Sequence, residues 1–291
     1  MRLDNVGRSA NRPTANIVAE ALIKTVRIAS SIEPLPLPGE SNGLGDGGTT
    51  VAFEGCGIAS WSVTAFLFDL DGTLLDSVYQ HVLSWREALE AHDIQLSVWK
   101  IHRKIGMSGG LFTQGLLRET GRPLSPELIA AVQEAHADAY QRRMDQVRPL
   151  PGAQELLDHL SSVQVPWAVA TSGRTGSAAA ARRFLDIPLD VPVVTRDDVE
   201  HAKPDPDLFT EAARRLGVAI EEAVVVGDSV WDLLAARRAR ALGVGLLSGG
   251  YGEDELIRAG AYRVYADPSD LLAHLDEVGA RRVGRERDGQ R

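Results

Sequence analysis

The sequence predicts an α/β fold in which a doubly wound parallel sheet carries a small all-helical insert after its first strand. Short apolar segments alternate with helical segments from residue 151 onward, a pattern typical of parallel strands joined by crossover helices. A long helical region, about residues 78–147, separates this alternation from an earlier apolar segment that ends at Asp69. The fold is therefore expected to have one sheet and two structural parts.

Composition excludes several classes of protein. The 291 residues are 44% hydrophobic and 24% charged, which is the balance of a soluble globular protein. The net charge of −9 disfavours binding to nucleic acid, and no apolar run approaches the ~20 residues that a membrane span needs. The single cysteine, Cys56, excludes an intramolecular disulfide framework and a multi-cysteine zinc site. We predict a cytoplasmic protein with neither a membrane nor a nucleic-acid partner.

Residues 1–60 are predicted to be a disordered N-terminal arm and linker. Three prolines and seven glycines fall between residues 34 and 57, a density that no helix or sheet interior sustains. Within the arm, residues 17–30 place apolar side chains on one helical face. Two interpretations stay open for this segment: a transient helix, or a helix that docks onto the core or onto a protein partner.

The first strand is expected at residues 63–68, because this apolar run is short and ends in a carboxylate. The helical insert, residues 78–147, follows it. Ser125 and Pro126 have the chemistry of a helix start, with a hydroxyl at the N-cap and proline at the first helical position. The first helix of the insert has an apolar stripe made by Val82, Trp85, Ala88 and Leu89.

Five more strands and five helices are expected after the insert. The strands are Trp167–Thr171, Val191–Thr195, Ala223–Gly227, Val244–Leu247 and Tyr262–Tyr265. The helices are Gln154–Leu160, Ser177–Leu185, Pro206–Leu216, Val230–Ala241 and Glu253–Ala259. Residues 61–77 and 148–278 then form the core domain, residues 78–147 a helical domain, and residues 279–291 a flexible tail.

Polar residues follow four of the predicted strands, at the sheet edge where ligands bind in such folds. These residues are Asp69, Asp71 and Gly72 after the first strand, Thr171 and Ser172 after the second, Lys203 near the third, and Asp228 with Asp232 after the fourth. Carboxylates at this density repel one another unless a cation neutralises them, and an all-oxygen ligand set favours Mg²⁺.

These groups suit phosphoryl transfer. One carboxylate can attack phosphorus, and a second carboxylate two residues away can protonate the leaving oxygen. Lys203 and Thr171 can bind the remaining phosphoryl oxygens, and the Gly72 loop can donate backbone N–H groups.

The same residues resemble the four motifs of the haloacid dehalogenase superfamily, over residues 61–275. The matching segments are Phe68–Leu74, Thr171–Gly173, Lys203–Pro206 and Gly227–Ser229. The helical insert is similar to the C1-type cap of that superfamily, on a Rossmann-like core.

The resemblance implies a role for each motif residue. Asp69 is then nucleophile and metal ligand, and Asp71 is the general acid/base whose carbonyl binds the metal. Thr171 and Lys203 hold the phosphoryl group, Asp228 binds Mg²⁺, and Asp232 supports the metal from outside its ligand shell. Asp71 indicates phosphoryl transfer, because the dehalogenases of the superfamily lack this second aspartate and its ion pumps carry threonine there.

Substrate contacts are expected from the insert, which closes over the site in such enzymes. The candidates are His81, Trp85, Arg86 and the turn at residues 106–110. For His81 a place on the helix surface is an equal alternative, and Arg86 is expected to bind an anionic substrate.

The sequence suggests three candidate functions for this protein. The residues alone favour a phosphatase of small phosphate monoesters, of the phosphoglycolate or sugar-phosphate type. The whole chain also resembles a mycobacterial protein tyrosine kinase built on this fold, which implies ATP as donor and protein tyrosines as acceptors. We take the kinase as the main expectation and the phosphatase as the alternative. A protein-docking module that uses the N-terminal arm is the second alternative.

Overall fold

The computed structural model describes residues 65–107, 109–121 and 125–279. The predicted arm at residues 1–60, its helical segment at 17–30, and all of the predicted tail except Gly279 lie outside these ranges. Among the described helices, none has the length and apolar character to cross a membrane. The cytoplasmic location stays a prediction.

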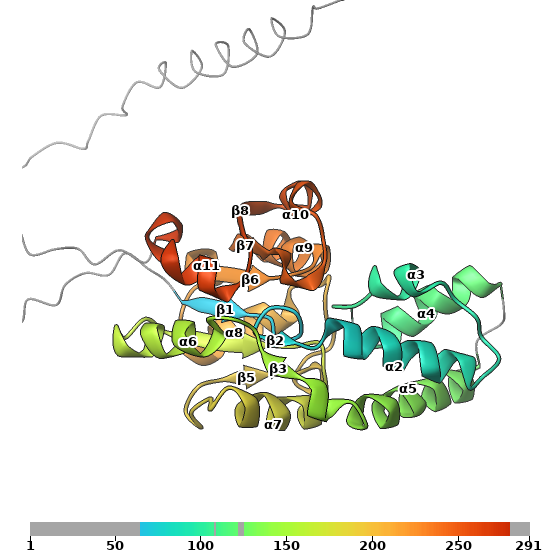
Figure 1. Ribbon diagram of the computed structural model, residues 1–291. Coiled ribbons are helices and arrows are strands. Elements are labelled where there is room, and N and C mark those ends of the chain that lie inside the picture. Colours follow the sequence, from blue (N-terminus) through green and yellow to red (C-terminus); the bar gives the residue numbers. More distant parts are fainter. Residues whose placement is uncertain (1–64, 108, 122–124, 280–291) are drawn as a thin grey trace, which may run out of the picture. The chain divides into compact units, whose positions relative to one another are not determined.

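Six parallel strands form one sheet in the order β5-β4-β1-β6-β7-β8 (Figure 1). The strands are β1 Phe66–Phe68, β4 Trp167–Ala170, β5 Val193–Val194, β6 Val224–Gly227, β7 Leu242–Leu246 and β8 Ala261–Tyr265. Each later strand overlaps a segment expected from the sequence. The order places β1 in the interior, between β4 and β6, and confirms the predicted α/β class.

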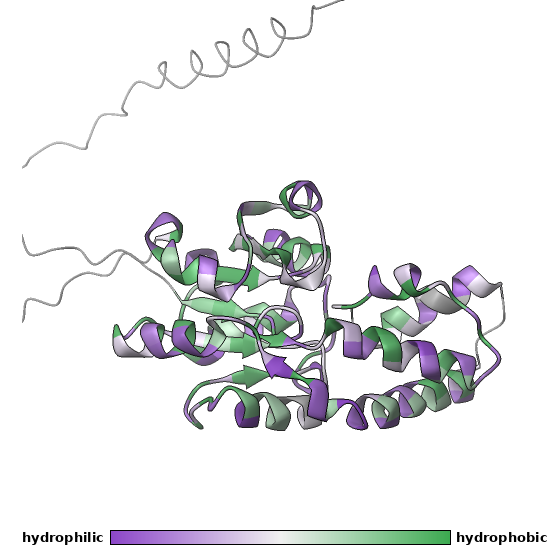
Figure 2. Cartoon of the chain, viewed as in Figure 1, coloured by the Kyte–Doolittle hydropathy of each residue, from purple (hydrophilic) through white to green (hydrophobic). Residues whose placement is uncertain are grey.

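Helices cover both faces of this sheet. Alternate residues of β1 point to opposite faces, so that Phe66 and Phe68 pack with α6 Ala153–Ser162, α7 Thr175–Phe184 and α11 Pro268–Ala273. Leu67 packs on the other face with α8 Asp207–Leu216 and α9 Val230–Ala239, and α10 Glu253–Ala259 packs against α9 and β8. Figure 2 shows the strands hydrophobic and the helices mixed, as expected for a sheet buried on both faces.

The insert contains α2 Val78–Glu90, α3 Val98–His102, α4 Gly109–Thr120 and α5 Pro126–Gln141. The predicted apolar stripe of α2 is buried in a cluster of its own, with Ile101, Phe112 and Val132. Ser125 caps α5, because its hydroxyl accepts a 3.2 Å hydrogen bond from the N–H of Leu128. The division into a core domain and a helical domain stays a prediction, which the separate apolar cluster supports.

Two short strands that the sequence did not suggest join these parts. β2 Leu75–Asp76 leads into the insert, β3 Arg148–Pro149 leads out of it, and the two pair antiparallel. Short 3₁₀ turns complete the described chain: η1 Met144–Gln146, η2 Arg196–Asp198, η3 Ile220–Glu222, η4 Leu247–Gly249 and η5 Leu275–Val278.

Candidate active site

The carboxyl ends of β4, β1 and β6 bring three predicted site residues together. Thr171, Asp69 and Asp228 follow these adjacent parallel strands, and each is at most 4% exposed. Asp69 continues the sheet ladder, since its N–H donates to the Val226 carbonyl over 2.9 Å. The convergence predicted from the motif order is therefore a consequence of strand order.

Lys203 lies fully buried among these carboxylates, on the loop before α8. Its Nζ donates a hydrogen bond to Asp69 Oδ1 and forms an ion pair of 2.8 Å with Asp232 Oδ1, although the second contact lacks hydrogen-bond geometry. The same Nζ lies 4.9 Å from the centre of the Phe209 ring. A buried ammonium is stable only with such partners, so Lys203 fixes the relative positions of two acidic side chains.

Negative charge exceeds positive charge in this cluster. Burial alone would lower the pKa of Lys203, but Asp232 and Asp69 raise it. Burial, assisted by Asp232 and opposed by Lys203, raises the pKa of Asp69 to about 7. Burial and the charges of Asp232 and Asp69 also raise the pKa of Asp228 well above its ordinary value. One ammonium thus lies among three carboxylates, and this excess of negative charge is compatible with a further cation.

The oxygen atoms of this cluster fit a divalent cation. One carboxylate oxygen from each of Asp69, Asp228 and Asp232 lies within 4.8 Å of the others. Both carboxylate oxygens of Asp232 have partners. Lys203 Nζ lies beside Oδ1, and the N–H and hydroxyl of Ser229 donate to Oδ2 over 3.1 and 2.5 Å. Within the described part of the chain, Asp69 Oδ2 and Asp228 Oδ2 receive no hydrogen bond. These two oxygens suit Mg²⁺ as direct ligands, with Asp232 in support.

Asp71 has a different environment from Asp69. Ser77 Oγ donates to Asp71 Oδ1 over 2.6 Å, and His81 Nε2 lies 3.2 Å from the same oxygen. Burial alone would raise the pKa of Asp71, but the charge and hydrogen bond of His81, with the Ser77 hydroxyl, lower it. The side chain is 20% exposed, which leaves it open to a substrate. Ser77 and His81 therefore hold Asp71 in place on the insert side of the cluster.

The residues after Asp71 build the metal-binding side of the cluster. The N–H of Gly72 donates to the Leu75 carbonyl over 2.7 Å. This N–H is therefore not free to bind a phosphate, in contrast to the expectation for the Gly72 loop. Glycine is needed here for space, because a Cβ would lie 2.6 Å from Asp228 Oδ2. Thr73, which the sequence analysis missed, donates its hydroxyl to Asp228 Oδ1 over 3.0 Å.

The two polar residues after β4 have different partners. Thr171 Oγ1 accepts a 2.9 Å hydrogen bond from the N–H of Gly173, which orients the hydroxyl. Ser172 Oγ donates to the Gly106 carbonyl over 2.9 Å, so it connects the core to the insert. Phosphate binding by Thr171, Ser172 and Lys203 stays a prediction.

The structure separates the candidates from the insert. His81 reaches Asp71, as described above. Arg86 does not join the cluster: its half-exposed side chain pairs with Glu90 over 2.8 Å on the same helix. Trp85 is 6% exposed within the insert's own apolar cluster. Of the predicted turn, Gly106 contacts the core, and Ser108 lies outside the described residues.

One segment of the insert packs against the core beside the cluster. His102 Nε2 lies 2.8 Å from the Gly249 carbonyl, and Arg103 forms an ion pair with Glu255. The Arg103 carbonyl accepts a 2.9 Å hydrogen bond from the Tyr251 hydroxyl. Sequence reasoning missed these residues, because no local motif indicates which face of the insert meets the core.

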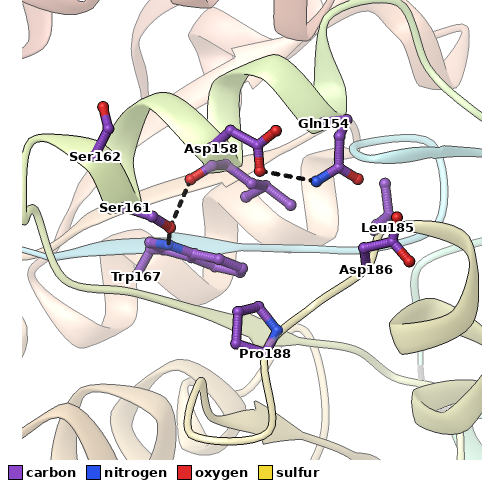
Figure 3. Close-up of a pocket in the computed structure, with 9 residues that line it drawn as sticks. Gln154, Asp158, Ser161, Ser162, Trp167, Leu185, Asp186 and Pro188 are labelled. Carbon is purple, nitrogen blue, oxygen red and sulfur yellow. Dashed lines mark hydrogen bonds between the residues drawn. The ribbon is translucent and has the colours of Figure 1, made fainter.

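A pocket of about 430 Å³ lies elsewhere, along α6 and the start of β4 (Figure 3). Trp167 forms part of its wall and donates its indole N–H to Ser161 Oγ over 2.9 Å. None of the predicted site residues lines this pocket. The chemistry is therefore assigned to the carboxyl ends of the strands and not to this cavity.

Comparison with known families identifies the fold. The family described as haloacid dehalogenase-like hydrolase matches residues 63–240. The chain belongs to this family. The match spans all four motif strands, Lys203 and both aspartates after β6, which include the parts that build the cluster.

Several of the curated proteins similar to this chain are named phosphatases. Hexitol phosphatase A of Escherichia coli is 33% identical over 60% of this chain and 78% of its own length. Phosphoglycolate phosphatase of Caulobacter vibrioides is 30% identical over 71% of this chain and 85% of its own. The crystal structure of a hydrolase from Pseudomonas syringae is 54% identical, with a TM-score of 0.72 over 74% of this chain and 99% of the other.

These comparisons correct the main functional expectation. The protein tyrosine kinase, with ATP as donor and a protein as acceptor, is not supported, because the relatives are named phosphatases. The expectation relied on a whole-chain resemblance and on no kinase motif. The alternative inferred from the motif residues is the one that the relatives favour.

Proposed function

We propose that this protein is a Mg²⁺-dependent phosphatase of small phosphate monoesters. The observation that carries the proposal is the contrast between two neighbouring carboxylates. Asp69 is buried against Lys203 beside two other carboxylates, whereas Asp71 is partly exposed and bonded to Ser77 and His81. Two carboxylates in different environments can divide the roles of nucleophile and acid/base.

The chemistry follows from these positions. An Asp69 oxygen attacks phosphorus, the ester bond breaks, and Asp71 gives a proton to the departing alcohol oxygen. Water then attacks the aspartyl-phosphate and transfers a proton to Asp71, which releases inorganic phosphate and restores Asp69. Lys203 and Thr171 bind the other phosphoryl oxygens. Asp69 and Asp228 would hold Mg²⁺, which would supply positive charge to offset the negative charge of the phosphate.

The substrate class is drawn from the relatives and from the enclosure of the site. The relatives named above act on hexitol phosphates and on phosphoglycolate, which are small phosphate monoesters. The His102–Gly106 segment lies against the core beside the cluster, which suits a small alcohol better than a protein chain. We infer that residues 61–77 and 148–278 form the catalytic domain and residues 78–147 form its cap.

The test is phosphate release from p-nitrophenyl phosphate, glycerol 3-phosphate and phosphoglycolate, with Mg²⁺ and then with a chelator. We expect Asp69→Asn to lower turnover by about 10⁶-fold, the loss typical of removing a nucleophile. Asp76→Asn is the matched control, because Asp76 is an exposed aspartate in the same segment. Turnover that persists in Asp69→Asn, or that ignores the chelator, contradicts the proposal.

A further inference from the structure

The turn η4, directly after β7, contacts three separate parts of the site. Ser248 Oγ donates to the Gly72 carbonyl over 2.6 Å, which ties the turn to the loop after β1. The backbone of Gly249 packs against Asp228, since a Cβ at Gly249 would overlap that carboxylate. The Gly249 carbonyl accepts the hydrogen bond from His102 of the insert. One turn therefore links the insert to a candidate metal ligand.

The carboxylate of Asp228 is confined by this arrangement. Thr73 holds Oδ1 through its hydroxyl at 3.0 Å. Oδ2 lies between two glycine backbones, because a Cβ at Gly72 or at Gly249 would collide with it. Because Ser248 bonds the turn η4 to Gly72, the two glycine backbones on either side of Oδ2 move together. The direction of Asp228 Oδ2 thus depends on where the turn lies.

The hydrogen bond from the insert to this turn has a defined donor and acceptor. A carbonyl oxygen only accepts, so His102 Nε2 carries the proton and donates it to Gly249. The ring of His102 stacks on Tyr79 at 5.4 Å and lies 5.8 Å from the Tyr251 ring, which fixes its orientation. If the insert moves away from the core, this hydrogen bond is lost, and the insert no longer holds the turn η4 in place.

We propose that Ser248 and Gly249 are positioning residues that aim Asp228 Oδ2 at the metal, and that His102 couples docking of the insert to Mg²⁺ affinity. The inference rests on the proposed role of Asp228 as a metal ligand. Coupling of two equilibria is reciprocal. Docking of the insert then strengthens Mg²⁺ binding, and Mg²⁺ strengthens docking of the insert.

Mg²⁺ alone is the probe, with its Kd measured by titration calorimetry on the full chain without substrate. Ser248→Ala removes the tie to Gly72, and we expect Kd to rise about tenfold, as for loss of a group that orients a metal ligand. His102→Phe keeps the ring stack but removes the donor, and we expect Kd to rise about fivefold. The melting temperature of the metal-free variants reports whether either change harms folding.

Tyr251→Phe is the matched control. It removes another hydrogen bond between insert and core, from the Tyr251 hydroxyl to the Arg103 carbonyl, without touching the turn. We expect its Mg²⁺ Kd to equal that of the unchanged protein. Equal Kd values in His102→Phe and Tyr251→Phe overturn the coupling, even if phosphatase activity is present. An unchanged protein that binds no Mg²⁺ overturns the metal site itself, and the inference with it.

Discussion

The side chains around Asp71 form a stack of rings that continues into the insert. His81 Nδ1 lies 3.2 Å from His136 Nε2, and the His136 ring stacks on Trp85 at 4.0 Å. The Tyr140 ring stacks on His81 at 3.8 Å. These contacts fix the ring of His81 that bonds to Asp71. At the scale of residues, the acid/base candidate is oriented by aromatic packing as well as by charge.

The stability of the insert should depend on pH through His136. Burial and the charge of His81 lower the pKa of His136 well below its ordinary value of 6.5. As pH falls through 6.5, the unfolded chain takes up a proton at this residue and the folded chain does not, so the free energy of unfolding falls. His136→Phe keeps a ring in the stack and removes this proton uptake. As pH falls from 7 to 5, we expect the melting temperature of His136→Phe to fall less than that of the unchanged protein.

His159→Phe provides the control, because His159 is an exposed histidine on α6. Its melting curve should follow the unchanged protein across the same pH range. Parallel pH profiles for His136→Phe and the unchanged protein would count against the assignment.

At the scale of elements, the two connections to the insert run side by side. β2 and β3 pair antiparallel, with Leu75 opposite Pro149 and Asp76 opposite Arg148. The next residues, Ser77 and His81 at the start of α2, contact Asp71. A movement of the insert about this strand pair therefore acts directly on the acid/base candidate.

The contact between α6 and α11 can be tested with a pair of glycines. Gly152 and Gly217 both have positive φ, +75° and +72°, so alanine at either is strained by about 1 kcal/mol. A Cβ at Gly152 would also lie 2.5 Å from Ser269 Cα, whereas nothing lies within 4 Å of one at Gly217. Overpacking adds about 2 kcal/mol. Urea unfolding should show Gly152→Ala destabilised by about 3 kcal/mol and Gly217→Ala by about 1 kcal/mol. Equal losses would mean that α11 yields to the added atom.

For the whole molecule, the cluster is nearly closed to solvent. Asp69 and Asp228 are 4% exposed, while Lys203 and Asp232 are fully buried. A substrate has to reach Asp69, and the insert contacts the core beside the cluster, so we expect opening of the insert to contribute to turnover.

Within the described part of the chain, the core and the insert supply contacts that orient Asp69, Asp71 and Lys203, so we predict that the N-terminal arm is dispensable for the reaction. Deletion of residues 1–60 should leave the kcat/KM for p-nitrophenyl phosphate and the melting temperature unchanged. The same deletion in Asp69→Asn gives the background rate. A loss of activity on this small ester would instead assign the arm a role at the site.

The sequence by itself determined the fold class, the motifs of the family and the phosphoryl-transfer chemistry, because these depend on local patterns. Asp69 and Asp228 follow buried apolar strands, and parallel strands bring their carboxyl ends to one edge. The tertiary structure decided which polar groups orient them. The contacts of His102, Ser248 and Gly249 depend on how the insert and the β7 turn pack, and the packing of α2 leaves the Arg86–Glu90 pair half exposed, outside the cluster. No local pattern encodes such long-range packing, and a whole-chain resemblance misled the choice between kinase and phosphatase.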